Sequence, residues 1–107
     1  MIYELRIYTI AQGKEKALND RFKNVTLDLF KKYGINVCDF WTDLKGEKLY
    51  YICSFENEQK REEIWNSFKA DKDWIKAKSD SEVNGSLTEK VESILLKRVD
   101  YIKPEWK

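Results

Sequence analysis

The chain has 107 residues, of which 42% are hydrophobic, and its 20 basic and 19 acidic residues give a formal net charge of +1. This balance gives no electrostatic case for binding nucleic acid or a membrane surface, and no apolar run approaches the roughly 20 residues of a membrane span. The length fits one domain, residues 1–107. The N-terminus has the pattern of a strand that contains Glu4 and not that of a signal peptide, so we expect a cytoplasmic protein.

Histidine is absent, and the two cysteines, Cys38 and Cys53, lie far apart in the sequence. Histidine is the commonest metal ligand and general base, and two thiols cannot hold zinc alone. We therefore expect no metal site, no haem and no other cofactor. Cysteines of a cytosolic chain are usually reduced, so we expect both to be buried thiols.

Residues 1–10 are rich in β-branched and aromatic side chains, and the run stops before Gly13, which is the pattern of a strand. Successive strand residues point to opposite faces, so Glu4, Arg6 and Tyr8 share one face. The odd-numbered residues form a second, nearly apolar face. Neither face has the pattern of a solvated surface, so we expect both to be covered. Parity alone does not reveal which face meets the helices.

Residues 14–32 repeat large apolar side chains at helical spacing, with lysines and asparagines between them. The stripe is formed by Leu18, Phe22, Val25 and Leu29. This pattern predicts one amphipathic helix, and Gly34 is its natural C-terminal stop.

Residues 35–42 and 49–55 have the composition of two strands, and Gly46 between them can adopt the positive φ of a tight turn. They predict an antiparallel hairpin with two alternative registers. A two-residue loop places Cys38 opposite Cys53, whereas a three-residue loop with a bulge places Cys38 opposite Ile52.

Asn57 is expected to cap a second helix that runs to about residue 70. Its apolar edge is formed by Ile64, Trp65 and Phe68. Residues 60–63, Lys-Arg-Glu-Glu, are interpreted as an ordinary solvated charged face. Asp71 or Asp73 is then expected to cap a short helix that holds Trp74, followed by a polar loop at 79–88.

Residues 89–102 contain a long last strand, which Pro104 is expected to end. The order is then strand, helix, strand, strand, helix, strand. This order predicts an α+β fold, a ferredoxin-like βαββαβ unit with a four-stranded antiparallel sheet. Every strand has bulky apolar residues on both faces, and two helices can cover only one. We therefore expect a homodimer in which sheet packs against sheet, forming a dimeric α+β barrel.

Five residues are candidates for a ligand site. In one interpretation Arg6 binds an anionic or carbonyl group, Tyr8 donates a hydrogen bond, and Glu4 orients Arg6 or accepts a proton. In the alternative, the same residues form a structural network at the sheet–sheet interface, because buried charges need partners. Trp41 and Trp74 are either walls of an aromatic pocket or ordinary core residues.

Several segments resemble NIPSNAP-domain proteins. They are residues 2–9, Ile-Tyr-Glu-Leu-Arg-Ile-Tyr-Thr, then Gly13-Lys14, Phe40-Trp41-Thr42, and residues 70–74, Ala-Asp-Lys-Asp-Trp, with Lys72 where the family usually has proline. The resemblance covers nearly the whole chain and implies a dimeric α+β barrel, but it brings no agreed catalytic activity. Neighbours in that superfamily include cofactor-independent monooxygenases, lactone isomerases and haem-degrading enzymes, whose catalytic residue sets do not map onto this chain.

Two classes of function follow. The first is a protein that binds or converts a small apolar or aromatic molecule without metal or haem, in a monooxygenase- or isomerase-like way. The second is a non-catalytic dimeric protein-interaction module. A formed cavity lined by Arg6 or Tyr8 would favour the first class, and a filled core would favour the second.

Overall fold

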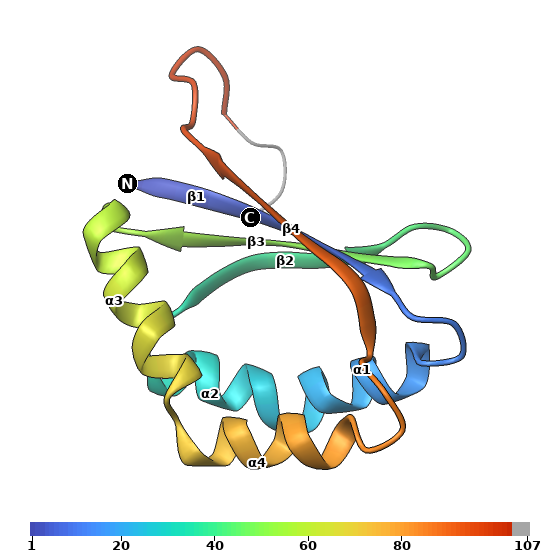
Figure 1. Cartoon of the computed structure of the whole chain (residues 1–107). Coiled ribbons are helices and arrows are strands. Elements are labelled where there is room, and N and C mark those ends of the chain that lie inside the picture. Colours follow the sequence, from blue (N-terminus) through green and yellow to red (C-terminus); the bar gives the residue numbers. More distant parts are fainter. Residues whose placement is uncertain (104–107) are drawn as a thin grey trace.

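The computed structural model describes residues 1–103 and shows four strands with helices against one face of the sheet (Figure 1). The elements in chain order are β1 (Ile2–Ile10), α1 (Glu15–Arg21), the π-helix η1 (Phe22–Thr26), α2 (Leu27–Lys32), β2 (Asn36–Thr42), β3 (Lys48–Phe55), α3 (Glu58–Lys69), α4 (Lys72–Ser81) and β4 (Thr88–Leu96). None of the helices within these residues is long and apolar enough to cross a membrane.

The strand order in the sheet is β2-β3-β1-β4, and every neighbouring pair is antiparallel. This is the ferredoxin-like arrangement, with the first strand in the centre and the last strand at one edge. The predicted α+β fold class is therefore confirmed. The central position of β1 puts its side chains within reach of residues from both neighbouring strands.

The register shows which face of β1 meets the helices. On β3, Tyr51 and Cys53 are fully buried, and they pair with Arg6 and Glu4 of β1. Side chains of paired residues lie on the same face of a sheet. The face of β1 that carries Glu4, Arg6 and Tyr8 therefore faces the helices, and the odd-numbered face is the open one.

The open face of the sheet is apolar at its centre. Leu5 and Ile7 of β1 lie there beside Tyr50 and Ile52 of β3, and all four are only half-buried. Ile94 of β4, which pairs with Leu5, is 45% exposed. No helix in residues 1–103 covers this face (Figure 1).

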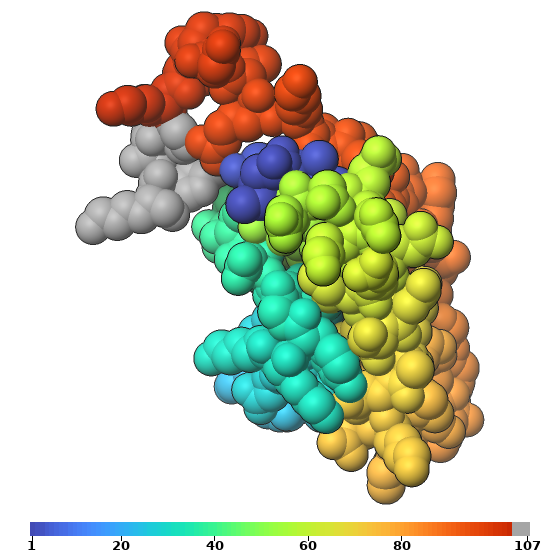
Figure 2. Space-filling model, turned by 90° about the vertical axis from the view of Figure 1, so that its left-hand side faces the viewer, coloured from blue at the N-terminus to red at the C-terminus, as the bar shows by residue number. Residues whose placement is uncertain are grey.

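The last strand is shorter than predicted. It ends at Leu96, and residues 97–103 leave the sheet and project on the side away from the helices (Figures 1 and 2). The expectation that the strand continues to residue 102 is wrong, because β4 pairs with β1 only as far as Leu96 opposite Tyr3, and β1 itself begins one residue further, at Ile2. The expected role of Pro104 lies outside the described residues.

The predicted first helix exists, but its middle is π-helical. Leu18, Phe22, Thr26 and Phe30 are buried at a constant spacing of four residues, whereas Val25 is only half-buried. A regular α-helix has 3.6 residues per turn, so this spacing would drift around its surface. The wider π turn absorbs the drift, and the Thr26 hydroxyl donates to the Arg21 carbonyl at 3.2 Å. The helix ends at Lys32, and Gly34, two residues further on with a φ of 73°, confirms the predicted stop.

The hairpin follows neither predicted register over its whole length. Asp39 pairs with Ile52, as a two-residue loop predicts, but Val37 pairs with Cys53. Cys38 is therefore the extra residue of a β-bulge and is opposite neither partner. Cys38 is exposed, so the expectation of two buried thiols is wrong for it, whereas Cys53 is buried.

The second half of the chain confirms the predicted caps. The Asn57 side chain accepts a hydrogen bond from the backbone of Lys60, and Asp71, not Asp73, caps α4. The loop expected at 79–88 begins later, because α4 continues to Ser81. Two hydrogen bonds stabilise this extra turn. The Ser81 hydroxyl donates to the Lys78 carbonyl, and Arg21 donates to the Ser81 hydroxyl.

Candidate functional site

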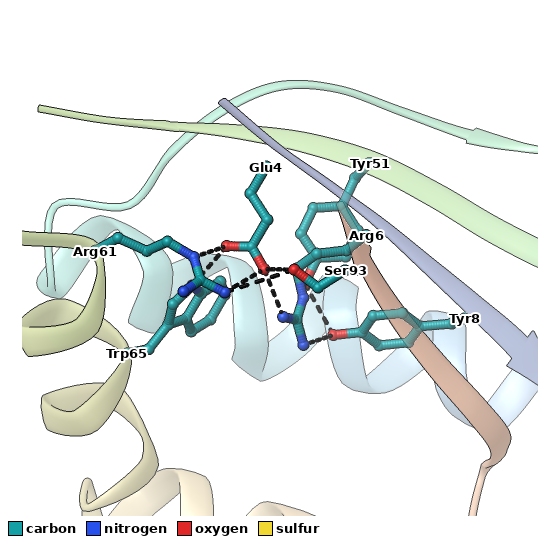
Figure 3. A network of polar contacts seen from close by, with 7 residues as sticks. All are labelled: Glu4, Arg6, Tyr8, Tyr51, Arg61, Trp65 and Ser93. Carbon is teal, nitrogen blue, oxygen red and sulfur yellow. Dashed lines mark hydrogen bonds and ion pairs between the residues drawn. The ribbon is translucent and has the colours of Figure 1, made fainter. Parts of the chain in front are cut away.

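The carboxylate of Glu4 is the centre of a polar cluster beneath the sheet (Figure 3). Its Oε1 accepts hydrogen bonds from Arg61 Nε at 2.8 Å and Trp65 Nε1 at 2.9 Å. Its Oε2 accepts from Arg6 Nη1 at 2.9 Å, Arg61 Nη2 at 3.1 Å and Ser93 Oγ at 2.6 Å. The side chain is fully buried. One carboxylate thus joins β1 to β4 and to α3.

These five hydrogen bonds keep Glu4 ionised. Burial alone raises the pKa of the carboxyl, but hydrogen bonds from Arg61, Ser93, Trp65 and Arg6 outweigh it and bring the pKa to about 2. Glu4 is therefore an anion throughout the neutral range. Since two guanidinium groups share its charge, the cluster as a whole keeps one positive charge.

The guanidinium of Arg6 has a different set of partners on its other edge. Its Nε donates to the Tyr51 hydroxyl at 2.9 Å, and its Nη2 donates to the Tyr8 hydroxyl at 3.3 Å. The two hydroxyl oxygens lie 2.8 Å apart, and the guanidinium lies over the Trp65 ring at 4.7 Å. Burial lowers the pKa of Arg6, but the two tyrosines and Glu4 raise it by a larger amount. The pKa therefore lies above its ordinary value, and the group stays charged.

A cavity of about 660 Å³ lies between this cluster and the helices. Arg6 and Tyr8 line it from the sheet. Aromatic side chains line it from the helices, among them Phe30, Trp65 and Trp74. Its volume falls within the roughly 300–1,000 Å³ that is common for small-molecule sites. The arrangement can enclose an apolar body and present polar groups to one end of it.

The charged side chains that line the cavity are mostly basic. They are Arg6, Arg21, Lys69 and Lys78, and the one carboxylate among the described lining residues is that of Glu82. Glu82 is itself paired with Arg21 at 2.9 Å and Lys78 at 3.3 Å. The cavity therefore has an excess of positive charge, which favours an anionic ligand.

Arg21 is a second buried guanidinium in this cavity, with 8% of its side chain exposed. Its Nη1 donates to Ser81 and Glu82, and its charge lies 4.9 Å from the Trp74 ring. Its Nε is buried and has no acceptor among residues 1–103. The sequence interpretation did not include Arg21 in the site.

The structure brings together four of the five predicted site residues. Glu4, Arg6 and Tyr8 share one cluster, and Trp74 lines the cavity from the helix side. Trp41 does not belong to it, because it pairs with Tyr50 on the open face and is 40% exposed. The expectation that Trp41 forms a pocket wall is wrong, since the register turns Phe40, and not Trp41, toward the helices.

The sequence interpretation missed Arg61, Tyr51 and Ser93. The sequence predicts a solvated face for residues 60–63, and for Arg61 this prediction is wrong. A signal was present, because Arg61 lies one helical turn before Trp65 and shares its face. Ser93 and Tyr51 depend on the strand register, which the sequence left open.

The described residues, 1–103, contain no group of three or more histidine, cysteine, aspartate or glutamate side chains placed to hold a metal ion. The expectation that the protein uses no metal or haem stays a prediction. The thiol of Cys53 lies next to the cluster on β3, and burial raises its pKa to about 12. It is therefore a neutral thiol at physiological pH, which argues against a reactive role.

Comparison with known proteins gives a family and a fold. The model of the family described as NIPSNAP matches residues 3–103. An uncharacterised NIPSNAP domain protein from Burkholderia xenovorans is 20% identical, with 97% of this chain and 100% of that chain covered and a TM-score of 0.81. A NIPSNAP family protein with unknown function from Agrobacterium tumefaciens is 19% identical, covering 95% and 91% of the two chains, with a TM-score of 0.82.

A more distant likeness is to a monooxygenase of Streptomyces coelicolor in complex with nanaomycin D. It is 9% identical, with 97% of this chain and 92% of that chain covered and a TM-score of 0.68. At this identity the likeness concerns the fold alone. No curated protein matches the chain.

Proposed function

The chain belongs to the NIPSNAP family, and from this premise we propose that it binds a small, largely aromatic anion in the cavity between sheet and helices, without metal or haem. The observation that carries the proposal is the cavity of about 660 Å³ with Arg6 and Tyr8 on its floor. A filled core at this place would have favoured the alternative, a non-catalytic interaction module. The formed cavity supports a ligand.

The class of ligand follows from the lining. Arg6 keeps 19% of its side chain exposed, and the guanidinium has N–H groups beyond those that bind Glu4, Tyr51 and Tyr8. Aromatic rings and an excess of basic groups line the rest of the cavity. Aromatic rings stack on each other, and guanidinium groups bind carboxylate and other oxyanions well.

Conversion of the bound molecule is the finer form of the proposal. A monooxygenase-like reaction is supported by the shared fold of the Streptomyces monooxygenase, whose structure contains nanaomycin D. An isomerase-like reaction is the alternative form of the proposal. We also propose a homodimer, joined through the open sheet face, as the assembly in which the protein acts, and a cytoplasmic location. The apolar residues of the open face support the dimer.

The test is a ligand screen on matched variants. Thermal melts and calorimetric titrations use benzoate, salicylate and 2-naphthoate with the wild type, Arg6→Met and Arg98→Met. Arg98 lies over the Tyr3 ring on the open face at 5.3 Å, so its variant removes an equal charge on the other face of the sheet from the cavity.

We expect 2-naphthoate to raise the melting temperature of the wild type and of Arg98→Met, but not of Arg6→Met. Arg6→Met should stay folded, because Glu4 keeps Arg61, Trp65 and Ser93 as partners. A large loss of stability in Arg6→Met, with no aromatic acid bound by the wild type, would defeat the proposal and support a purely structural network.

A further inference from the structure

The two tyrosine hydroxyls of the cluster do not have equal roles, and a count of protons shows why. Arg6 only donates hydrogen bonds, and it donates to both Tyr51 and Tyr8. Each hydroxyl oxygen therefore accepts from Arg6. The hydroxyls also share one hydrogen bond of 2.8 Å, in which one of them must donate. Two protons are thus available for one bond, and one proton is left over.

The environment of Tyr51 assigns the direction of that bond. Tyr51 is fully buried, and its only polar neighbours in residues 1–103 are Arg6 and Tyr8. If Tyr8 donated, the buried Tyr51 proton would have no acceptor, which is costly. The pKa of Tyr51 is raised well above its ordinary value, mainly by burial and to a smaller extent by nearby Tyr8, so this hydroxyl keeps its proton. Tyr51 therefore donates to Tyr8.

The leftover proton then belongs to Tyr8, which lines the cavity. The Tyr8 oxygen already accepts from Arg6 Nη2 and from Tyr51, so both of its lone pairs are used. Arg6 has two further N–H groups, one on Nη1 and one on Nη2, beyond those that donate to Glu4 and Tyr8. At this point the cavity floor offers donors only.

A floor of this kind favours a group that only accepts. We propose that the Tyr8 hydroxyl and the Arg6 guanidinium form an oxyanion-binding site, and that the cavity takes a phenol or an enol in its ionised form. This inference rests on the proposed function, since it names the chemical group that the cavity ligand presents to the sheet. A neutral phenol also accepts hydrogen bonds, but its own proton would face the donors of Arg6 and Tyr8. The anion lacks that proton and accepts more strongly.

The charges around the site stay constant near neutral pH, which makes the inference testable by pH. The chain has no histidine, the pKa of Glu4 is about 2, and that of Tyr51 is raised. The other groups that face the site or line the cavity are Arg61, Arg21, Lys69, Lys78 and Glu82. Arginine and lysine ordinarily titrate far above neutrality. Burial raises the pKa of Glu82, but Arg21 and Lys78 outweigh it and keep the pKa below its ordinary value. A change of affinity with pH therefore reports the ionisation of the ligand.

The experiment uses 4-nitrophenol, whose absorption distinguishes its neutral and ionised forms. Dissociation constants are measured below and above the pKa of the free probe for the wild type, Tyr8→Phe and Tyr50→Phe. Tyr50 belongs to the same sheet but lies on the open face, so Tyr50→Phe removes an equivalent hydroxyl outside the cavity. A melt of each variant verifies folding.

We expect the wild type and Tyr50→Phe to bind the ionised probe at least about tenfold more tightly than the neutral probe, and Tyr8→Phe to lose most of this preference. A second comparison needs no variant: 4-nitroanisole, which has no proton to lose, should bind the wild type equally at both pH values. Binding of 4-nitrophenol without any preference, or a preference that Tyr8→Phe retains, would overturn this inference and leave the proposed function in place. Failure of the wild type to bind either probe, together with failure to bind the aromatic acids, would overturn both.

Discussion

At the scale of single residues, the burial of Glu4 makes stability depend on pH. The carboxyl has a pKa of about 2 in the folded protein against its ordinary value of 4.5. Because the pKa is lower in the folded protein, ionised Glu4 stabilises the folded state at pH values above the pKa of the unfolded chain. This stabilisation is lost as the pH falls through the pKa of the folded protein. We expect the free energy of unfolding to decrease by about 3 kcal/mol between pH 4.5 and pH 2 from this group.

Urea unfolding at several pH values tests this expectation with Glu4→Gln and a control, Glu62→Gln, on the exposed side of α3. Glu4→Gln should be less stable than the wild type at neutral pH, and it should lack this part of the acid dependence. Glu62→Gln should follow the wild type. An acid dependence that Glu4→Gln shares with the wild type would contradict the assignment of the low pKa.

Arg61 gives a second prediction at this scale. Its Nε and Nη2 both bind the Glu4 carboxylate, whereas the side chain of its neighbour Lys60 makes, within residues 1–103, only an exposed ion pair with Glu63 at 3.9 Å. We expect Arg61→Met to lower the free energy of unfolding by roughly 1–3 kcal/mol, because a buried anion loses two charge-assisted hydrogen bonds. Lys60→Met should change it by less than about 0.5 kcal/mol. Denaturant unfolding of both variants measures the difference. Equal effects would contradict the prediction and mean that Arg61 belongs to the solvated face of the helix.

Sequence alone could group Glu4, Arg6 and Tyr8, because the two-residue period of a strand fixes which side chains share a face. It could not supply their partners. Tyr51 and Ser93 reach the cluster only through strand pairing, over separations of 45 and 89 residues. For Trp41 the sequence leaves a pocket wall and an ordinary core position open, because an aromatic residue on a strand suits either face equally well, and only the register distinguishes the two faces.

At the scale of elements, the cap of α4 offers a matched test. Asp71 accepts hydrogen bonds from the backbone N–H groups of Asp73 and Trp74 and also from Lys32 at 3.0 Å and from Tyr33. It thus joins the start of α4 to the end of α2. We expect Asp71→Asn to lower the melting temperature clearly, because the neutral amide loses the ionic part of these contacts.

The control is Asp73→Asn, the other residue that the sequence offered as a cap. Its side chain makes no hydrogen bond or ion pair with the residues from Met1 to Lys103, so its variant should melt close to the wild type. Circular dichroism melts of the two variants decide between the positions. A larger effect of Asp73→Asn would mean that the helix begins elsewhere.

The elements themselves were largely predictable, and their irregularities were not. Repeats of apolar residues identified all four strands and the helices, because each repeat reflects one buried face. The π turn at Phe22–Thr26 and the bulge at Cys38 each insert one residue into a regular pattern. Such insertions satisfy the packing of a particular core or strand register, and the local sequence therefore contains no distinct signal for them.

At the scale of the whole molecule, the open sheet face predicts association. Ile94 on β4 is 45% exposed beside half-buried Leu5 and Ile7, and apolar surface of this kind is usually covered in solution. We expect sedimentation at micromolar concentration to give about twice the chain mass of 12.8 kDa. Ile94→Lys should sediment as a monomer, because a lysine in an apolar interface is not solvated.

Val83→Lys is the matched control, since Val83 is 75% exposed in the loop between α4 and β4. It should sediment as the wild type does. A stable wild-type monomer at these concentrations would defeat the dimer, and loss of the dimer in both variants would assign it to another surface.

The central place of β1 also has a consequence for the order in which the chain acquires its structure. Of the four strands, β1 is synthesised first, yet it pairs with β4, which is synthesised last. The Glu4 carboxylate accepts its hydrogen bond from Ser93 across 89 residues of sequence. Contacts so distant in sequence slow folding, because the chain must close a long loop before it gains their energy. Until β4 is synthesised, the edge of β1 that pairs with β4 therefore stays unpaired. Unpaired strand edges can pair with strands of other chains. A chain interrupted before Thr88 would keep that edge permanently, and we expect it to aggregate rather than to fold with three strands.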